Sequence, residues 1–326
     1  MTFARQSKTI VIIAFDGVQL LDVTGPADVF AKADQLRPDS YRLIITSPTG
    51  GEIVTNSGLT LSRAIPLAVV KDDIDTILVA GGDEAALRRA IYEQGLADWL
   101  TDASVNTRRI GSVCTGAFAL AAAGLLDGRR ATTHWHSCDL LQQMCPAARV
   151  ETDVIYTIDT PVYTSAGVTA GIDLALALVE EDFGRAIAAE VARELVLFVR
   201  RPGGQSQLSA GLAAQANASS RLGDLIPWII DHRDADLSVS ALAERSGMSE
   251  RSFARNFREQ TGQTPARFVE QTRLDHVCDL LENSDWPLER LAQRSGFGSV
   301  DALQRAFRRR YAMTPRACRH LADSQI

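Results

Sequence analysis

The sequence predicts an α/β domain with a doubly wound, flavodoxin-like parallel sheet, followed by an all-α domain with two helix-turn-helix motifs. Two observations carry this prediction. Apolar, β-branched runs alternate with helical patterns through the first part of the chain, as in a parallel sheet wrapped by helices. Towards the other end, the segment 242–267 returns in altered form at 291–317. The length of 326 residues is sufficient for two domains, each with its own core.

The first strand is predicted over Lys8–Phe15, a run dominated by apolar and β-branched residues that suits a strand covered on both faces. Further strands are predicted at Arg42–Thr46, Thr76–Ala80, Ile110–Val113 and Val162–Ser165. Helical patterns begin near Pro26, Glu84, Thr115, Ser137 and Thr169, and Ala170–Leu197 is interpreted as two helices interrupted at Gly184.

In such sheets the functional crevice lies at the carboxyl ends of the strands, so we read the residues that follow each run. Asp22 follows the first strand and Gly81-Gly82 follow the third, where glycines would let backbone N–H groups approach a ligand. The fourth strand runs through Cys114 directly into an apolar helix, which has the form of a nucleophile elbow. A helix N-terminus favours the thiolate, so a reactive cysteine is expected; the alternative is a small, buried, apolar cysteine.

These residues resemble the amidotransferase-like superfamily that includes PfpI proteases and isocyanide hydratase, over residues 8–183. The likeness to isocyanide hydratase covers Asp22, Gly81-Gly82, the turn Ser112–Gly116 and Arg130–Trp135. It implies that Cys114 attacks, Asp22 handles a proton and Thr115 orients. It also implies an effector pocket, either catalytic or vestigial as a catalytic site, which is formed by Asp22, Gly81, Gly82, Cys114, Thr115, His134 and Trp135.

The departures from these relatives limit the chemistry. Hydrolytic PfpI relatives place a histidine after the cysteine, where this chain has Thr115, and the His-x-Glu pair of glutaminases is absent. Peptidase and glutaminase activities are therefore not expected. His134, His136 and Cys138 could suggest a metal site, but three ligands within five residues fit a strand-to-helix corner better than a closed tetrahedral site. We expect no metal and no cofactor.

The repeat near the other end matches Leu242–Gly247 with Leu291–Gly296 at an offset of 49, and later positions at an offset of 50. Each copy is interpreted as a short apolar helix, a glycine turn, an N-cap serine (Ser249 or Ser299) and a second helix with arginines facing outwards. A single helix over 264–283 is expected to join the copies. Two such motifs held about 34 Å apart can enter successive major grooves of DNA.

The charge is divided between the two parts of the chain, although the net charge is −6. Residues 245–320 contain 14 Arg and no Lys against 9 acidic residues, whereas residues 1–220 contain 18 basic and 25 acidic residues. The basic part would neutralise DNA phosphates, while the acidic part keeps the rest of the protein away from DNA.

Residues 221–320 resemble an AraC/XylS-type DNA-binding domain, including Phe307–Tyr311 followed by Thr314-Pro315. The resemblance assigns Arg251, Ala254, Arg255 and Arg258 of the first motif, and Val300, Asp301, Gln304, Arg305 and Arg308 of the second, to DNA contact. Each arginine could instead lie on a solvated helix face, although the repeated pair Arg255 and Arg305 favours base contact. The second copy has one arginine fewer on this face, so we expect the first motif to dominate.

The domain boundaries are predicted at 1–201 for the amidotransferase-like sensor, 202–220 for an exposed linker rich in small residues, and 221–326 for the DNA-binding domain. Five irregularly spaced cysteines favour a reducing cytoplasm, and the first apolar run is too short for a signal peptide or a membrane span.

The whole chain resembles GlxA-like regulators of the AraC/XylS family. The resemblance implies that the protein binds promoter DNA, senses a small effector that could be a nitrogenous metabolite, and forms a homodimer through the N-terminal domain. The alternative is a working enzyme, a thiol-dependent, hydratase-like catalyst fused to a DNA-binding domain, which the presence of Asp22, Cys114 and Thr115 favours.

Overall fold

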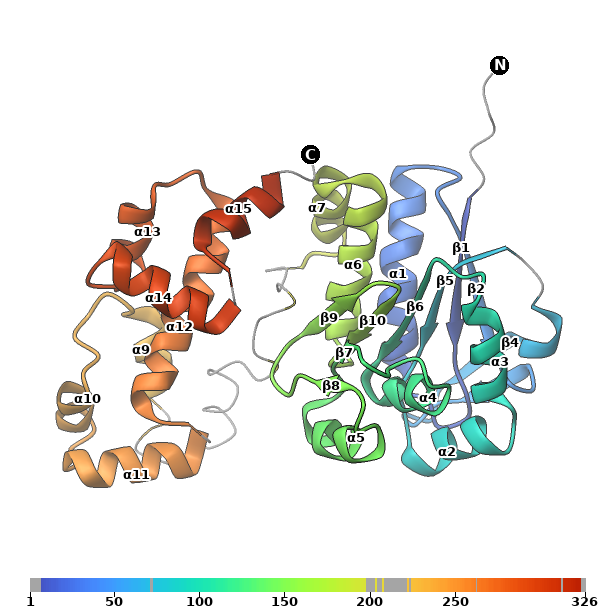
Figure 1. Cartoon of the computed structure of the whole chain (residues 1–326), viewed down its shortest axis with the longest axis horizontal. Coiled ribbons are helices and arrows are strands. Elements are labelled where there is room, and N and C mark those ends of the chain that lie inside the picture. The colour runs from blue at the N-terminus through green and yellow to red at the C-terminus, as the bar shows by residue number, and fades with distance from the viewer. Residues whose placement is uncertain are drawn as a thin grey trace, which may run out of the picture. The chain divides into compact units, whose positions relative to one another are not determined.

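The computed structural model describes residues 7–70, 73–197, 203, 207, 222, 224–261, 263–311 and 313–323. The chain divides into two units, Met1–Gln207 and Leu208–Ile326 (Figure 1). The predicted linker, 202–220, lies almost entirely outside the described residues, so its boundaries stay a prediction. Within the described residues, no helix combines the length and apolar character needed to span a membrane.

In the described part of the N-terminal unit, eight strands form one mixed sheet in the order β3-β4-β2-β1-β5-β6-β10-β9. Its strands are β1 (Lys8–Ile13), β2 (Tyr41–Ser47), β3 (Gly51–Val54), β4 (Thr60–Pro66), β5 (Ile74–Val79), β6 (Arg109–Val113), β9 (Tyr156–Asp159) and β10 (Val162–Ser165). The pairs between β4 and β10 are parallel, whereas the edge pairs β3–β4 and β9–β10 are antiparallel. A separate two-stranded ladder joins β7 (Arg130–Ala131) to β8 (Arg149–Val150).

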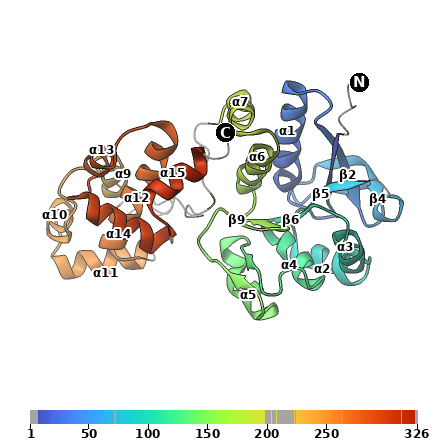
Figure 2. The ribbon, with the colours of Figure 1, turned by 45° about the horizontal axis from the view of Figure 1, so that its top comes forward.

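Helices cover both faces of the sheet, as Figure 2 shows. One face carries α1 (Leu20–Leu36), α6 (Ala170–Phe183) and α7 (Arg185–Glu194), and the other carries α2 (Glu84–Tyr92), α3 (Leu96–Ser104) and α4 (Ala117–Ala122). The helix α5 (Cys138–Met144) lies next to α4. The predicted doubly wound α/β fold is confirmed, and the apolar run Ile10–Ile13 is fully buried at its centre.

Two local predictions were wrong or incomplete. The first helix begins at Leu20 and not near Pro26, which lies inside it. Proline was taken as a helix start, but the apolar residues before it already pack as helical turns against the core. The strands β3, β4 and β9 were not predicted, because they have mixed exposure in place of a buried run; β3 and β9 are the two edge strands and β4 pairs with β3.

The C-terminal unit is helical, as predicted. It contains α9 (Leu225–Asp231), α10 (Val239–Arg245), α11 (Glu250–Thr261), α12 (Pro265–Asn283), α13 (Leu288–Arg294), α14 (Val300–Tyr311) and α15 (Pro315–Asp323). Two separate apolar cores form, one around Phe253 and Phe257 and the other around Leu303 and Phe307. The long helix α12 contributes to both cores, so it joins the two helix-turn-helix motifs α10–α11 and α13–α14.

Candidate functional sites

The Cys114 turn lies where β6 ends and the short 3-10 helix η2 (Cys114–Gly116) leads into α4. Cys114 has a φ of 57°, in the left-handed region that a side chain rarely adopts. Two glycines make room for it: a Cβ added at Gly167 would lie 2.3 Å from the Cys114 Cβ, and one added at Gly81 would lie 2.8 Å from it. The sharp strand-to-helix turn is therefore present and tightly enclosed.

Asp22 on α1 is fully buried beside this turn. Its Oδ2 accepts a hydrogen bond from the Gly81 N–H at 3.1 Å, and its Oδ1 accepts one from the Val168 N–H at 2.7 Å. Burial raises the pKa of Asp22 to about 6, against the lowering effect of these two N–H groups and of a hydrogen bond with the Cys114 thiol. Among the described residues, no cationic side chain forms an ion pair with Asp22.

The Cys114 thiol does not have the thiolate character that its position at a helix start predicted. Burial and the neighbouring Asp22 charge raise the pKa of Cys114 to about 12, and hydrogen bonds from Thr115 only partly oppose this. The prediction was wrong because the six-residue helix α4 supplies little favourable field, whereas a buried carboxylate in hydrogen-bond contact acts directly against the thiolate.

Gly81 and Gly82 use their N–H groups within the site. The Gly81 N–H binds Asp22, and the Gly82 N–H donates to the Thr115 Oγ1 at 3.0 Å. Neither position has room for a side chain, since a Cβ on Gly82 would lie 2.4 Å from the Gly17 carbonyl oxygen. These glycines therefore hold the Asp22 and Thr115 side chains in place, and their predicted role as free donors to a ligand does not fit the structure.

His134 and Trp135 lie at the edge of the site. The His134 ring is half-buried, and burial and the nearby His136 lower its pKa. Trp135 is 49% exposed, with its ring 5.5 Å from the His134 ring and 5.2 Å from the His136 ring. In the parts of the chain that the structure describes, no three His, Cys, Asp or Glu side chains gather as metal ligands would.

The sequence reasoning missed two residues that lie behind Cys114. The Thr133 hydroxyl donates to the Cys114 carbonyl oxygen at 2.7 Å. The Gln207 Nε2 donates to the Thr133 carbonyl oxygen at 3.0 Å and to the Thr132 Oγ1 at 3.2 Å. Hydrogen bonds thus lead from the Cys114 turn through buried threonines to the last residue of the N-terminal unit.

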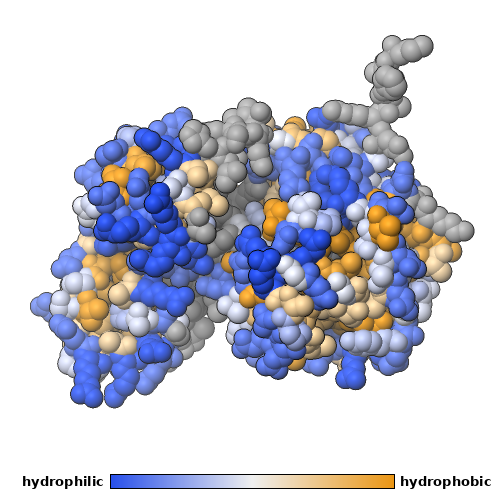
Figure 3. Space-filling model, in the orientation of Figure 1, coloured by the Kyte–Doolittle hydropathy of each residue, from blue (hydrophilic) through white to orange (hydrophobic). Residues whose placement is uncertain are grey.

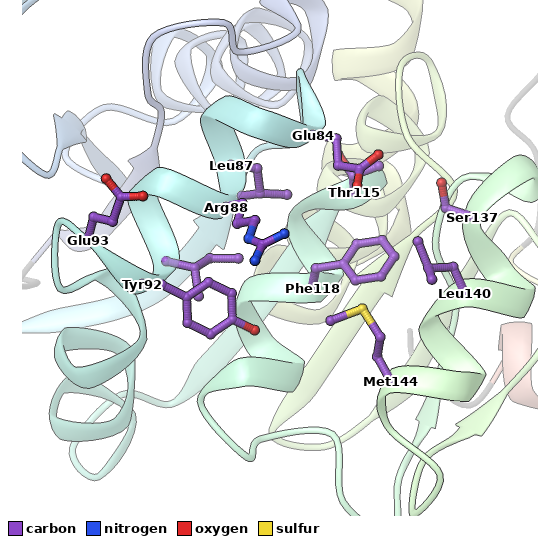
Figure 4. Close-up of a pocket in the computed structure, with 11 residues that line it drawn as sticks. Glu84, Leu87, Arg88, Tyr92, Glu93, Thr115, Phe118, Ser137, Leu140 and Met144 are labelled. Carbon is purple, nitrogen blue, oxygen red and sulfur yellow. The ribbon is translucent and has the colours of Figure 1, made fainter.

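A cavity of about 540 Å³ opens between α2, α4 and α5, beside the Cys114 turn (Figure 4). Of the predicted effector residues only Thr115 lines it; Asp22 and Cys114 are packed away behind this wall. The residues lining the cavity are Glu84, Leu87, Arg88, Ile91, Tyr92, Glu93, Thr115, Phe118, Ser137, Leu140 and Met144. The sequence could not reveal this cavity, because three helices far apart in the chain form its walls.

In the first helix-turn-helix, the side chains assigned to DNA lie on the open face of α11. Arg251, Arg255 and Arg258 are exposed and Ala254 is half-buried. Ser249 caps the helix, with its Oγ accepting from the Ser252 N–H at 3.3 Å, as the sequence predicted. In the space-filling view, hydrophilic side chains cover the surface over α11 and α14 (Figure 3).

The second motif repeats this arrangement on α14. Its assigned side chains are exposed (Asp301, Arg305 and Arg308) or half-buried (Val300 and Gln304). Ser299 caps this helix through the Ala302 N–H at 3.1 Å. The neighbouring Arg309 forms an exposed ion pair with Glu270 of α12 at 2.5 Å.

This double helix-turn-helix on an α/β partner defines a DNA-binding transcription regulator of the AraC type. Residues 8–181 match the DJ-1/PfpI family and residues 242–320 match a helix-turn-helix domain, so the chain belongs to the DJ-1/PfpI family and carries this second domain.

Two regulators match this chain over most of its length, and an enzyme matches about half of it. The HTH-type transcriptional regulator CdhR of Pseudomonas aeruginosa is 31% identical over 309 residues, covering 95% of this chain and 90% of the relative. GlxA of Rhizobium meliloti is 28% identical, covering 87% and 86%. The isonitrile hydratase of Pseudomonas putida is 36% identical over 174 residues, covering 53% of this chain and 71% of the enzyme.

A solved AraC family transcriptional regulator from Pseudomonas putida superposes with a TM-score of 0.52 at 25% identity. It covers 58% of this chain and 99% of its own length. The resemblance to GlxA-like regulators is thereby confirmed.

Proposed function

We propose that this regulator acts in the cytoplasm as a homodimer, and that its N-terminal unit binds a small-molecule effector that controls DNA binding by the C-terminal unit. The observation that carries the proposal is the combination of a cavity beside the Cys114 turn with an arginine-lined pair of recognition helices on one chain. The names of the relatives CdhR and GlxA support the regulatory output.

For the DNA-binding surface we propose base contact by Arg251, Ala254 and Arg255 in the first motif, with Arg258 nearer the backbone. Val300, Asp301, Gln304, Arg305 and Arg308 take the matching positions in the second. Arginine suits guanine and glutamine suits adenine, and each good pair discriminates against a wrong base by about 1–3 kcal/mol. The stronger role proposed for the first motif is supported by the exposed Arg251 on α11, because the matching position on α14 is the exposed, acidic Asp301.

The route from effector to DNA is proposed to run from the Cys114 turn to Gln207. This side chain is hydrogen-bonded to Thr132 and Thr133, and Thr133 binds the Cys114 carbonyl oxygen. A change in the Cys114 turn would therefore alter the anchor of the segment that leads towards the DNA-binding unit. Both threonines are fully buried, so their hydrogen bonds are costly to leave unmade.

The competing proposal is a thiol-dependent, isocyanide-hydratase-like enzyme, favoured by Asp22, Cys114 and Thr115 in contact with one another. The raised pKa of Cys114 and its burial support sensing over turnover, because the thiolate is the nucleophile. In the sensing proposal Thr115 lines the cavity, and Asp22 and Cys114 are packed behind it.

The test is a thermal-shift screen of the full chain against small metabolites, followed by DNA binding with and without each hit. We expect a hit that stabilises the protein and changes DNA affinity, and we expect Gln207→Ala to keep the stabilisation while losing the change in affinity. Turnover of an aryl isocyanide above a Cys114→Ala control would support the enzyme instead.

A further inference from the structure

The cavity between α2, α4 and α5 has the size and walls of a small-molecule site. Its volume of about 540 Å³ lies within the roughly 300–1,000 Å³ typical of ligand pockets. Apolar side chains form most of the wall: Leu87 and Ile91 from α2, Phe118 from α4, and Leu140 and Met144 from α5. Leu140 and Met144 are 44% and 54% exposed, so apolar surface remains for a ligand to cover.

Arg88 supplies the cation of this cavity. Arg88 is an exposed residue that lines the cavity, and in the view of Figure 4 its guanidinium group lies between the rings of Tyr92 and Phe118. Among the described residues Arg88 forms no ion pair or side-chain hydrogen bond, and it is the one basic side chain lining the cavity. A planar guanidinium with an apolar floor suits a carboxylate that binds through two parallel hydrogen bonds.

The acidic residues at the cavity limit where a carboxylate can sit. Glu84 lies two residues after Gly82, and the Gly82 N–H donates to the Thr115 hydroxyl. Glu84 is therefore at the end of the cavity next to the Cys114 turn. A carboxylate there would be repelled by it. Glu93 lies at the other end, and its carboxylate points away from the remaining side chains (Figure 4). Only the region around Arg88 therefore favours an anion.

We propose that this cavity is the effector site, and that it takes a small molecule with an aromatic or aliphatic body and a carboxylate bound by Arg88. The proposal rests on the effector-sensing function proposed above. It moves the site from the packed Asp22 and Cys114 side chains to the open side of Thr115. A ligand against Thr115 presses on the turn that carries Cys114, so it reaches the Thr133 and Gln207 hydrogen bonds without touching the thiol.

The test uses three probes that share a phenylpropyl group and differ in charge. They are the anion 3-phenylpropionate, the neutral 3-phenylpropanol and the cation 3-phenylpropylamine, each titrated into the full chain. We expect 3-phenylpropionate at a few times its Kd to raise the Tm of the N-terminal transition by roughly 2–4 °C, and the other two to have less effect. Arg88→Gln should weaken 3-phenylpropionate binding by roughly 10-fold to 100-fold, the loss of a charged hydrogen-bonded pair. The control is Arg89→Gln, the adjacent arginine, which lines a different cavity and should bind as the wild type does.

Equal stabilisation by the amine, or binding unchanged in Arg88→Gln, would overturn the proposal. A third result would also overturn it: the wild type binds none of the probes, and Met144→Glu lowers the sedimentation coefficient. The cavity would then be a face between two copies of the chain. If a metabolite from the screen changes DNA affinity but binds Arg88→Gln normally, the effector function stands and this location is wrong. A screen in which no metabolite changes the DNA affinity of the wild type would instead count against the proposed function.

Discussion

An aspartate side chain is buried at each end of the sheet, but only one of the two is paired with cationic side chains in the part of the chain that the structure describes. Asp182 near the amino ends of the strands has a side chain only 2% exposed, and it contacts Arg108, Arg109 and Lys8. Asp22 at the carboxyl ends is fully buried, and its partners among the described residues are two backbone N–H groups and the Cys114 thiol. Burying a charge without a cationic partner lowers the stability of the folded state. The paired end therefore contributes to stability, whereas the end with Asp22 carries the candidate site.

The amino end is built as a closed ionic network. Arg108 donates to Asp75 at 2.9 and 2.7 Å and to Asp182 at 2.8 Å, and the Tyr41 hydroxyl donates to Asp182 at 2.8 Å. Although burial raises the pKa of Asp75, hydrogen bonds from Arg108 and Thr76 hold it below its usual value. These contacts tie β1, β5, β6 and α6 together. They describe a structural end of the sheet, opposite the end that carries the site.

The largest effect is expected from Arg109→Met at the structural end. Arg109 is 1% exposed, and its loss leaves buried carboxylates with fewer cations, so we expect destabilisation by about 3–5 kcal/mol. Urea unfolding of the full chain measures it. The control is Arg130→Met, which breaks an exposed pair with Glu151 and should cost only about 0–1 kcal/mol. Equal costs would remove the distinction between the two ends.

Asp22→Asn tests the cost at the functional end. The folded pKa of about 6 lies above the ordinary aspartate value of 3.8, so the folded state holds the proton more tightly than the unfolded state. This stability is present below pH 3.8 and is lost as the pH rises through 6. Relative to Asp22→Asn, the wild type should lose on the order of 3 kcal/mol between pH 4 and 7. If the unfolding free energies of the wild type and of Asp22→Asn change with pH in the same way, the pKa of Asp22 is not raised in the folded state.

The smallest effect concerns the Cys114 thiol. Because the Asp22 charge raises the pKa of Cys114, Asp22→Asn should increase alkylation of Cys114 by iodoacetamide at pH 8, by roughly 3-fold to 10-fold. Mass analysis of the Cys114 peptide from the full chain measures the rate, with Cys114→Ser as the unlabelled control. Slower labelling would mean that Asp22 acts as a base for the thiol, and would favour the enzyme.

Local patterns made much of the fold predictable. The central strand was visible as a continuous apolar run, and the double helix-turn-helix was visible because its repeat, glycine turns and capping serines all act within a few residues of each other. Position at the carboxyl ends of strands also correctly brought Asp22 and Cys114 together.

What the sequence did not predict depends on long-range contacts. The Arg109–Asp182 pair joins residues 73 positions apart, and the Gln207–Thr133 hydrogen bond joins residues 74 apart. The protonation of Cys114 depends on burial and on a neighbour from α1, neither of which the local elbow pattern contains. The cavity is formed by three helices, so reading only the residues after each strand recovered Thr115 and missed Arg88.

The measurement that tests the central claim most directly is selection of the full chain on random DNA duplexes. The account predicts enrichment of a site with two blocks about one helical turn, roughly 10 base pairs, apart. The double variant Arg255→Ala, Arg305→Ala should lose this preference. Arg290→Ala, which removes one positive charge from a residue stacked on Trp286 and off both recognition helices, should keep it. No enrichment by the wild type, or the same enrichment by the double variant, would contradict the account.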